Sequence, residues 1–149
     1  MDAGGRVDGR RRGWVRRAVD GLVTAMVRRG TGPRGTVLLT VAGRTSGEPR
    51  TTPVTLVERD GVRWLVAPYG PVGWVRNVRA VGVVEARRGR RTERLVAEEV
   101  DAATGAPVLR QYLQEVAVVR RVFDVAPGDP VEAFVPLVPT HPVFRLRPA

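Results

Sequence analysis

The 149-residue chain has no cysteine, no lysine and one histidine, three residue types that often act in catalysis or bind metals. Without cysteine, disulfides, thiolate-held zinc, iron–sulfur clusters and cysteine nucleophiles are excluded. A metal site would depend on carboxylates, and we expect none. No run approaches the roughly 18 consecutive apolar residues of a membrane span, and the charged N-terminus lacks the apolar region of a secretory signal. We therefore expect a cytoplasmic protein.

The positive charge is carried entirely by arginine. There are 25 basic residues against 15 acidic ones, which gives a formal net charge of +10. The absence of lysine beside abundant Val, Ala and Gly is typical of a GC-rich genome, so the total charge is weak evidence for a nucleic-acid partner. The chain also lacks a nucleic-acid-binding motif and has only three Trp, two Tyr and three Phe for base stacking. We expect no specific nucleic acid.

The N-terminal part combines a basic tip with an amphipathic pattern. We expect residues 1–13 to be disordered and residues 14–149 to form one domain, because the chain is long enough for a single core. Apolar residues recur at helical spacing and predict a helix over 14–29; they are Trp14, Val15, Ala18, Val19, Leu22, Val23, Met26 and Val27. The favoured interpretation is a helix packed on the domain or on a second subunit. The alternative is peripheral membrane contact through residues 14–29, which a basic face beside a Trp-containing apolar face would suit.

Strand patterns dominate the rest of the chain. Strands are predicted over 36–42, 51–58, 62–67, 83–88, 92–100 and 143–147. Asp60-Gly61 and Gly89 are predicted at hairpin turns. Helices are predicted over 107–121 and, as a short helix, from Asp129-Pro130 up to Pro136. Strands joined by short turns and flanked by helices indicate an α+β fold built on a small antiparallel barrel.

A basic turn follows the first predicted strand and reads Gly43-Arg44-Thr45-Ser46-Gly47-Glu48-Pro49-Arg50-Thr51-Thr52-Pro53. Its guanidiniums, hydroxyls and backbone N–H groups could receive a phosphate or a carboxylate. It is not a Walker A loop, because the lysine and its spacing are missing. A solvated turn between two strands would explain the same residues. Pro53, just inside the following strand, indicates an edge or a bulge.

A second candidate segment, residues 67–80, is a rigid loop that runs into a short helix. Trp74 and Asn77 are neighbours one helical turn apart, so an indole, an amide and Arg76 could line an aromatic cofactor. Trp74 could equally anchor the helix in the core. The phenol of Tyr69 is either a proton-donating group of the site or a loop anchor.

The order of these motifs resembles that of the deazaflavin-dependent nitroreductase family. Over about residues 36–100 the order is a strand, Gly-Arg-x-Ser-Gly-x-Pro-Arg-x-x-Pro, a hairpin, Ala-x-x-Gly, Trp-x-x-Asn and a strand. The resemblance implies a split β-barrel of the FMN-binding kind that holds coenzyme F420, a deazaflavin with a phosphate and oligoglutamate tail. It also implies the contact residues, which are Arg44, Thr45, Ser46 and Arg50 at the tail, Thr51, Thr52, Pro53, Val54, Ala67, Pro68 and Tyr69 at the ring, and Trp74, Arg76 and Asn77 closing the pocket.

Two positions depart from that family. Thr45 stands where members often carry Lys, and Pro68-Tyr69 stands where they often carry a Ser-Lys pair. Arg76 could replace one of these charges. FMN on the same barrel is therefore kept as the alternative cofactor.

The resemblance implies an oxidoreductase that transfers a hydride from reduced F420 to a small organic acceptor, namely a quinone, an activated alkene or a nitroaromatic. In such an enzyme the cofactor itself performs the hydride transfer. The protein must orient it and supply a proton, for which Tyr69 is the first candidate and Tyr112 the second. The alternatives are an FMN-dependent reductase and a non-catalytic module that binds a flavin, a deazaflavin or a lipid-like ligand.

We expect a homodimer. His141 stands alone and is expected to be structural or solvated, since a Ser-His-Asp triad would depend on it and no nucleophile-elbow motif is present. The arginines of residues 87–94 are expected to form a solvated hairpin tip.

Overall fold

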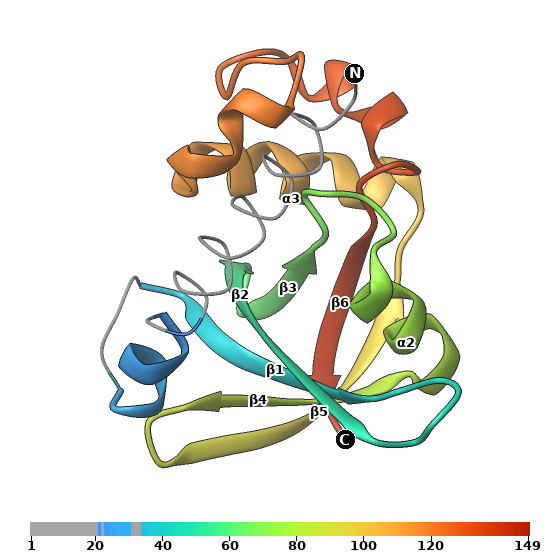
Figure 1. Ribbon diagram of the computed structural model, residues 1–149. Helices are drawn as coiled ribbons and strands as arrows, with labels where there is room; N and C mark the ends of the chain where they lie inside the picture. Colours follow the sequence, from blue (N-terminus) through green and yellow to red (C-terminus); the bar gives the residue numbers. More distant parts are fainter. Residues whose placement is uncertain (1–20, 22, 31–33) are drawn as a thin grey trace, which may run out of the picture.

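A computed structural model describes residues 21, 23–30 and 34–149 of the chain. Six strands form a closed barrel in the order β1-β2-β3-β6-β5-β4, with antiparallel pairing throughout (Figure 1). They are β1 (Thr36–Ala42), β2 (Pro49–Arg59), β3 (Val62–Val66), β4 (Val83–Arg88), β5 (Arg91–Glu99) and β6 (Val143–Pro148). The last strand closes the barrel because it pairs with both β3 and β5. The predicted α+β barrel is confirmed.

Local turn chemistry explains the hairpins. Asp60 and Gly61 both have positive φ, +54° and +74°, as a two-residue type I′ turn requires. β2 is longer than predicted at both ends. Pro53 lies in the part of β2 that pairs with β1 alone, because β3 joins β2 only from Leu56 onward. The predicted edge position is thus confirmed, and the register with β1 runs through Pro53 without interruption.

Two hydrophobic cores lie on the two faces of the sheet. Inward-facing side chains such as Leu39, Leu65 and Phe144 fill the barrel and are almost completely buried. On the outer face, Val57 and Trp64 pack with side chains of the helical segments. Burying a Leu or Phe side chain contributes roughly 1.5–3 kcal/mol, so both cores hold the strands in their register.

The main C-terminal helix begins earlier than predicted. α3 spans Ala102–Glu115, so the predicted range 107–121 is wrong at both ends. The carboxylate of Asp101 caps it by accepting a hydrogen bond from the backbone N–H of Thr104 at 2.8 Å. Pro107 lies inside the helix, where it removes one backbone donor. Beyond α3 the chain continues as a 3-10 helix, η1 (Ala117–Val122).

The predicted short helix after Asp129-Pro130 is also wrong in form. Two 3-10 turns replace it, η2 (Val131–Ala133) and η3 (Val135–Leu137). Asp129 does not cap them, because its carboxylate accepts a hydrogen bond from the backbone N–H of Ala126 at 2.8 Å. Pro136 lies within η3 and does not end it. Phe134, between the two turns, is fully buried in the outer core and holds this segment on the barrel.

The described end of the N-terminal helix packs on the barrel. Residues 23–28 are helical, and Val27 is fully buried. The carbonyl oxygen of Val27 accepts a hydrogen bond from the backbone N–H of Gly89 at 2.8 Å, at the turn between β4 and β5. The expected disordered tip over residues 1–13, and residues 14–20 and 22 of the expected helix, lie outside the described residues. None of the described helices is both long and apolar enough to cross a membrane.

Candidate functional site

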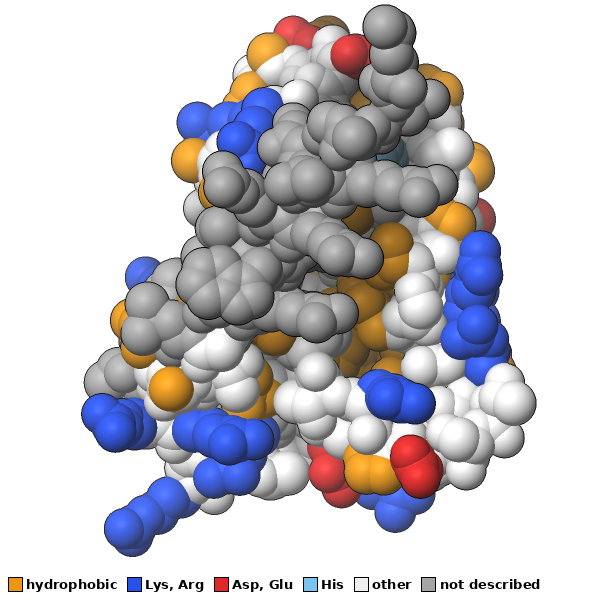
Figure 2. All heavy atoms as spheres, viewed as in Figure 1, with side chains coloured by type: hydrophobic (Ala, Val, Ile, Leu, Met, Phe, Trp, Pro, Cys, Tyr) orange, Lys and Arg blue, Asp and Glu red, His pale blue; other side chains and the backbone are white. Residues whose placement is uncertain are grey.

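The face drawn in Figure 2 has a hollow with hydrophobic side chains on its floor, beside α2 (Gly73–Val81). Arginine side chains stand at its rim on the side of α2. A shallow depression of about 340 Å³ is lined by residues of β1, β4, β5 and the C-terminal end of α2, together with Gly47 and Pro49 of the basic turn. The depression adjoins the basic turn, but none of the residues predicted to contact the cofactor lines it. The candidate site is therefore the hollow together with the basic turn.

The basic turn is joined to α2 by Arg44 and Asn77. The side-chain oxygen Oδ1 of Asn77 accepts a hydrogen bond from the backbone N–H of Arg44 at 3.1 Å. It accepts a second one from the guanidinium Nη1 of Arg44 at 2.9 Å. The structure thus brings the two predicted motifs together, although they lie 33 residues apart in the sequence.

The turn itself is a tight backbone loop. The N–H of Gly43 donates to the carbonyl of Glu48, and the N–H of Gly47 donates to the carbonyl of Gly43, both at 2.8 Å. A Cβ at Gly43 would lie 2.9 Å from Ser46 Oγ and 3.4 Å from the carbonyl oxygen of Glu48, so the loop closes this tightly only around glycine. Among the described residues, no hydrogen bond takes up the backbone N–H of Thr45 or Ser46. Successive N–H groups of this kind form an anion-binding concavity.

Two of the arginines near the turn are not neutralised by carboxylates. Within the described part of the chain, the side chain of neither Arg50 nor Arg76 forms an ion pair or a hydrogen bond. By contrast, Arg79 makes two hydrogen bonds to the carboxylate of Glu99, at 2.7 and 2.9 Å. These bonds raise the pKa of Arg79 and compensate its charge. The charges of Arg50 and Arg76 are therefore available to bind an anion, whereas the charge of Arg79 is paired with Glu99.

The residues predicted at the ring come from β2 and from the loop after β3, and those predicted to close the pocket come from α2. Thr51 Oγ1 lies 2.8 Å from Thr40 Oγ1 on β1, and Thr52 and Pro53 are half-buried. Val54 and Trp74 pack against the barrel core. Trp74 is only half-buried, so it anchors α2 while part of its indole stays accessible.

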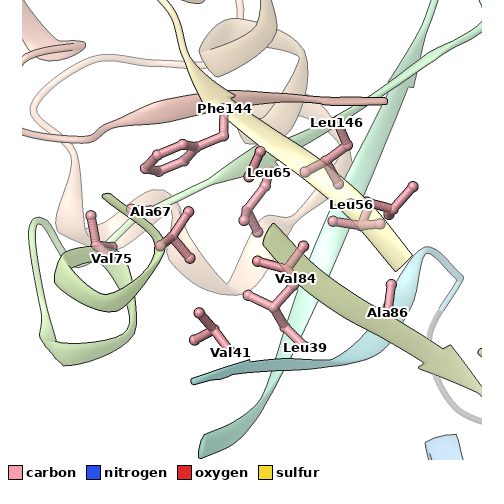
Figure 3. Packing of buried hydrophobic residues seen from close by; sticks show 13 residues of the cluster. Leu39, Val41, Leu56, Leu65, Ala67, Val75, Val84, Ala86, Phe144 and Leu146 are labelled. Atoms are coloured by element: carbon pink, nitrogen blue, oxygen red, sulfur yellow. The ribbon is translucent and has the colours of Figure 1, made fainter. Parts of the chain in front are cut away.

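The loop after β3 presents Tyr69 to solvent. Ala67 and Pro68 are buried, whereas 55% of Tyr69 is exposed. Ala67 and Val75 lie in the part of the barrel core nearest α2 (Figure 3). The backbone N–H of Ala67 donates to the carbonyl of Pro142 at 2.9 Å. The loop is thus held by the chain just before β6 and carries a phenol that solvent can reach.

Tyr112, the second candidate proton donor, lies in a different environment. Its side chain belongs to the outer core between α3 and the barrel and is 4% exposed. Burial, with a smaller contribution from Tyr69, raises the pKa of Tyr112 well above the ordinary value. A more weakly acidic and inaccessible phenol is a poor proton donor, so Tyr69 is the better candidate of the two.

Sequence reasoning missed two supporting contacts. It placed Asn77 at the pocket without identifying Arg44 as its partner, and it gave His141 no specific contact. His141 Nδ1 lies 2.9 Å from the carbonyl oxygen of Pro68, so the expected structural role is confirmed and sits next to Tyr69. No local sequence signal could have identified either pair, because 33 and 73 residues separate the partners. Among the described residues, no group of His, Asp and Glu is arranged to ligate a metal.

The family of the chain follows from its sequence profile. The profile of the F420H(2)-dependent quinone reductase family matches residues 9–126, which is most of the chain. The chain belongs to the F420H2-dependent quinone reductase family. Membership makes it an F420-dependent oxidoreductase and confirms the resemblance to deazaflavin-dependent reductases. The alternatives of an FMN-dependent reductase and of a non-catalytic module are therefore dropped.

Solved structures confirm the split-barrel fold of this reductase. A structure described as a domain-swapped dimer has a TM-score of 0.56 at 22% identity, with 90% of this chain and 97% of that chain covered. The F420-H2 dependent reductase FDR-A has a TM-score of 0.54 at 22% identity, covering 78% and 96%. The heme storage protein HutZ from Vibrio cholerae has a TM-score of 0.56 at 15% identity, covering 78% and 82%. At these identities the likeness concerns the fold alone. No curated protein matches the chain.

Proposed function

We propose that this reductase holds the anionic tail of F420 at the basic turn, holds its ring in the hollow beside α2, and reduces a quinone. The observation that carries the proposal is the turn itself. The N–H groups of Thr45 and Ser46 are available there, next to Arg44 and Arg50, and neither arginine is paired with a carboxylate. Such a combination of N–H groups and guanidiniums suits a phosphate, and the chemistry of these residues therefore fits the coenzyme.

Each part of the site has a separate task. Reduced F420 supplies the hydride when it is bound. The basic turn fixes one end of the coenzyme, while Trp74 and Val54, which are only partly buried, offer an apolar wall for a planar ring. An apolar wall also excludes water, which strengthens electrostatic interactions inside the site. Arg76, exposed and unpaired within the described residues, adds positive charge on the side of α2.

Tyr69 is the proposed proton donor. Two-electron reduction of a quinone by a hydride leaves negative charge on an oxygen, and this oxygen takes up a proton. Tyr69 follows the buried residues Ala67 and Pro68, and its side chain is exposed to solvent, so its phenol can donate the proton and recover one from water. A nitroaromatic or an activated alkene could accept the hydride at the same place and is tested beside the quinone.

The proposal is tested by F420 binding, followed by fluorescence, and by oxidation of reduced F420 with a quinone, a nitroaromatic and an activated alkene. The Arg44→Ala/Arg50→Ala double variant should lose F420 affinity by about a hundredfold, as expected for two charge-assisted contacts. Arg90→Ala, at the exposed β4–β5 turn, is the matched control and should bind normally. Unchanged F420 binding in the double variant would refute the tail site, and a preference for nitroaromatics over quinones would refute the proposed acceptor.

We also propose that the reductase is a homodimer. A structurally similar protein is described as a domain-swapped dimer, and Val118 and Val122 on η1 leave 66% and 43% of their surfaces exposed. Exposed aliphatic side chains of this kind are common where subunits meet. Light scattering coupled to gel filtration measures the mass directly, and a mass of 16.3 kDa, that of one chain, would refute the homodimer.

A further inference from the structure

Asn77 has an unusual position for a residue expected to touch a ligand. Its side chain is only 7% exposed on α2. Oδ1 accepts hydrogen bonds from both the backbone N–H and the guanidinium of Arg44. The same guanidinium nitrogen also lies 3.5 Å from the carbonyl oxygen of Gly73, one turn earlier on α2. Arg44 is therefore attached to α2 at both its backbone and its side chain.

This geometry limits what else Asn77 can do. A side-chain amide oxygen has two acceptor sites, and Arg44 occupies both of them. A coenzyme group could not hydrogen-bond to Oδ1 without displacing Arg44. The oxygen of Asn77 is thus committed to holding the turn.

We infer that Asn77 is a positioning residue that sets the affinity of this reductase for the anionic tail by orienting Arg44. The inference rests on the proposed function, in which Arg44 binds that tail. A surface arginine samples many rotamers, and ordering it on binding costs free energy. Because Nη1 of Arg44 is already held on α2, the side chain is ordered before the coenzyme binds. The remaining guanidinium N–H groups stay available for the tail.

The arrangement also couples the two ends of the site. Trp74 packs on the barrel core from the same helix that carries Asn77. A single rigid element therefore sets the place of the ring wall and the place of the tail receptor. Loss of Asn77 should weaken recognition of the tail alone, because the indole is anchored independently by the core.

The test compares F420 with a deazaflavin that lacks the phosphate tail, using fluorescence titration. Asn77→Ala should raise the dissociation constant for F420 about tenfold, the effect of one hydrogen bond to a charged group, and leave that of the tail-less deazaflavin unchanged. Arg44→Ala should do the same. The Asn77→Ala/Arg44→Ala double variant should bind F420 no more weakly than Arg44→Ala, because both changes remove one interaction. Equal weakening of both ligands, or additive losses, would overturn the inference.

Asn77→Asp tests whether the charge of Arg44 acts on the tail from its place beside Asn77. A carboxylate keeps both acceptors for Arg44, so the turn stays in place, but it neutralises the guanidinium. F420 affinity should fall at least tenfold, and its dependence on salt should become as shallow as in Arg44→Ala. Wild-type F420 affinity in Asn77→Asp would show that Arg44 does not act on the tail through its contact with Asn77. If Arg44→Ala weakens F420 binding and neither Asn77 variant does, the positioning role of Asn77 is refuted and the proposed tail site stands. If Arg44→Ala has no effect on F420 binding, both the positioning role and the proposed tail site are refuted.

Discussion

His141 Nδ1 lies 2.9 Å from the carbonyl oxygen of Pro68, the residue just before Tyr69. The ring of His141 also packs on Phe123, with 4.4 Å between ring centroids. A neighbouring backbone bond from Ala67 to Pro142 reinforces this contact. The loop with the proposed proton donor is therefore fixed by a turn that belongs to the C-terminal part of the chain.

Removing the imidazole should loosen that loop. We expect His141→Ala to lower the free energy of unfolding by about 1 kcal/mol, the usual net value of one hydrogen bond, and to lower kcat for quinone reduction while F420 affinity is kept. Urea denaturation and steady-state kinetics measure the two effects. His141→Asn is the control, because its amide N–H can replace Nδ1–H at a similar distance from the backbone. If His141→Asn loses as much activity as His141→Ala, packing on Phe123 and not the hydrogen bond positions the loop.

The phenol of Tyr69 should matter for catalysis and not for coenzyme binding. We expect Tyr69→Phe to lower kcat by about a hundredfold, the lower end of general acid catalysis, with an unchanged dissociation constant for F420. Stopped-flow oxidation of reduced F420 by a quinone measures the step directly. Tyr112→Phe removes a buried phenol that interacts electrostatically with Tyr69, so it should lower the rate far less than Tyr69→Phe does. An unchanged rate in Tyr69→Phe would remove the role assigned to this residue.

The strands and the barrel could be predicted from the sequence because their signals are local. Asp60-Gly61 fixes one hairpin by its backbone preference, and apolar runs such as 36–42 match β1 without error. The start of α3 was missed for an equally local reason. Proline favours the first turn of a helix, so the sequence predicts a start at Pro107. The small residues after Asp101 carry little apolar periodicity, and the capped first turn that they form is not predicted.

The candidate site could be predicted as two motifs but not as one assembly. Arg44 and Asn77 meet only because β1 and α2 pack on the same barrel. Hydrogen bonds across such sequence separations depend on tertiary packing, for which neither residue type nor spacing gives a signal. The contact between Pro68 and His141 could not be predicted from the sequence for the same reason, since it forms only when β6 pairs with β3 and closes the barrel.

The close approach of Gly89 to Gly30 offers a test of how the N-terminal helix is attached. Gly89 has φ of +60°, and a Cβ there would lie 3.2 Å from Gly30 Cα. We expect Gly89→Ala to destabilise the fold by about 1–2 kcal/mol, the cost of a left-handed alanine, with a further contribution from crowding. Gly128→Ala, with no atom within 4 Å of its Cβ, should change stability by less than about 0.5 kcal/mol. Equal urea midpoints for the two variants would show that neither the left-handed φ of Gly89 nor its approach to Gly30 opposes a side chain at this position.

The cap of α3 gives a prediction about pH. The hydrogen bond from the backbone N–H of Thr104 lowers the pKa of Asp101 in the folded protein. A group whose pKa is lower in the folded state stabilises it above its unfolded pKa of about 4, and loses this effect as pH falls through the folded value. The melting temperature of Asp101→Ala should therefore lie below that of the wild type at pH 7, and the difference should shrink at pH values below about 4.

Asp101→Asn distinguishes the charge of the cap from its geometry. Asparagine keeps an acceptor for the Thr104 N–H but does not titrate, so the melting temperature of Asp101→Asn relative to Asp101→Ala should not depend on pH. Differential scanning fluorimetry of the three proteins from pH 7 down to pH 3 provides the comparison. Should the wild type and Asp101→Asn keep the same separation from Asp101→Ala over this range, the carboxylate charge contributes nothing, and the cap acts through its neutral hydrogen bond alone. A wild-type advantage that disappears on acidification would instead assign the effect to the ionised carboxylate at the positive end of the α3 dipole.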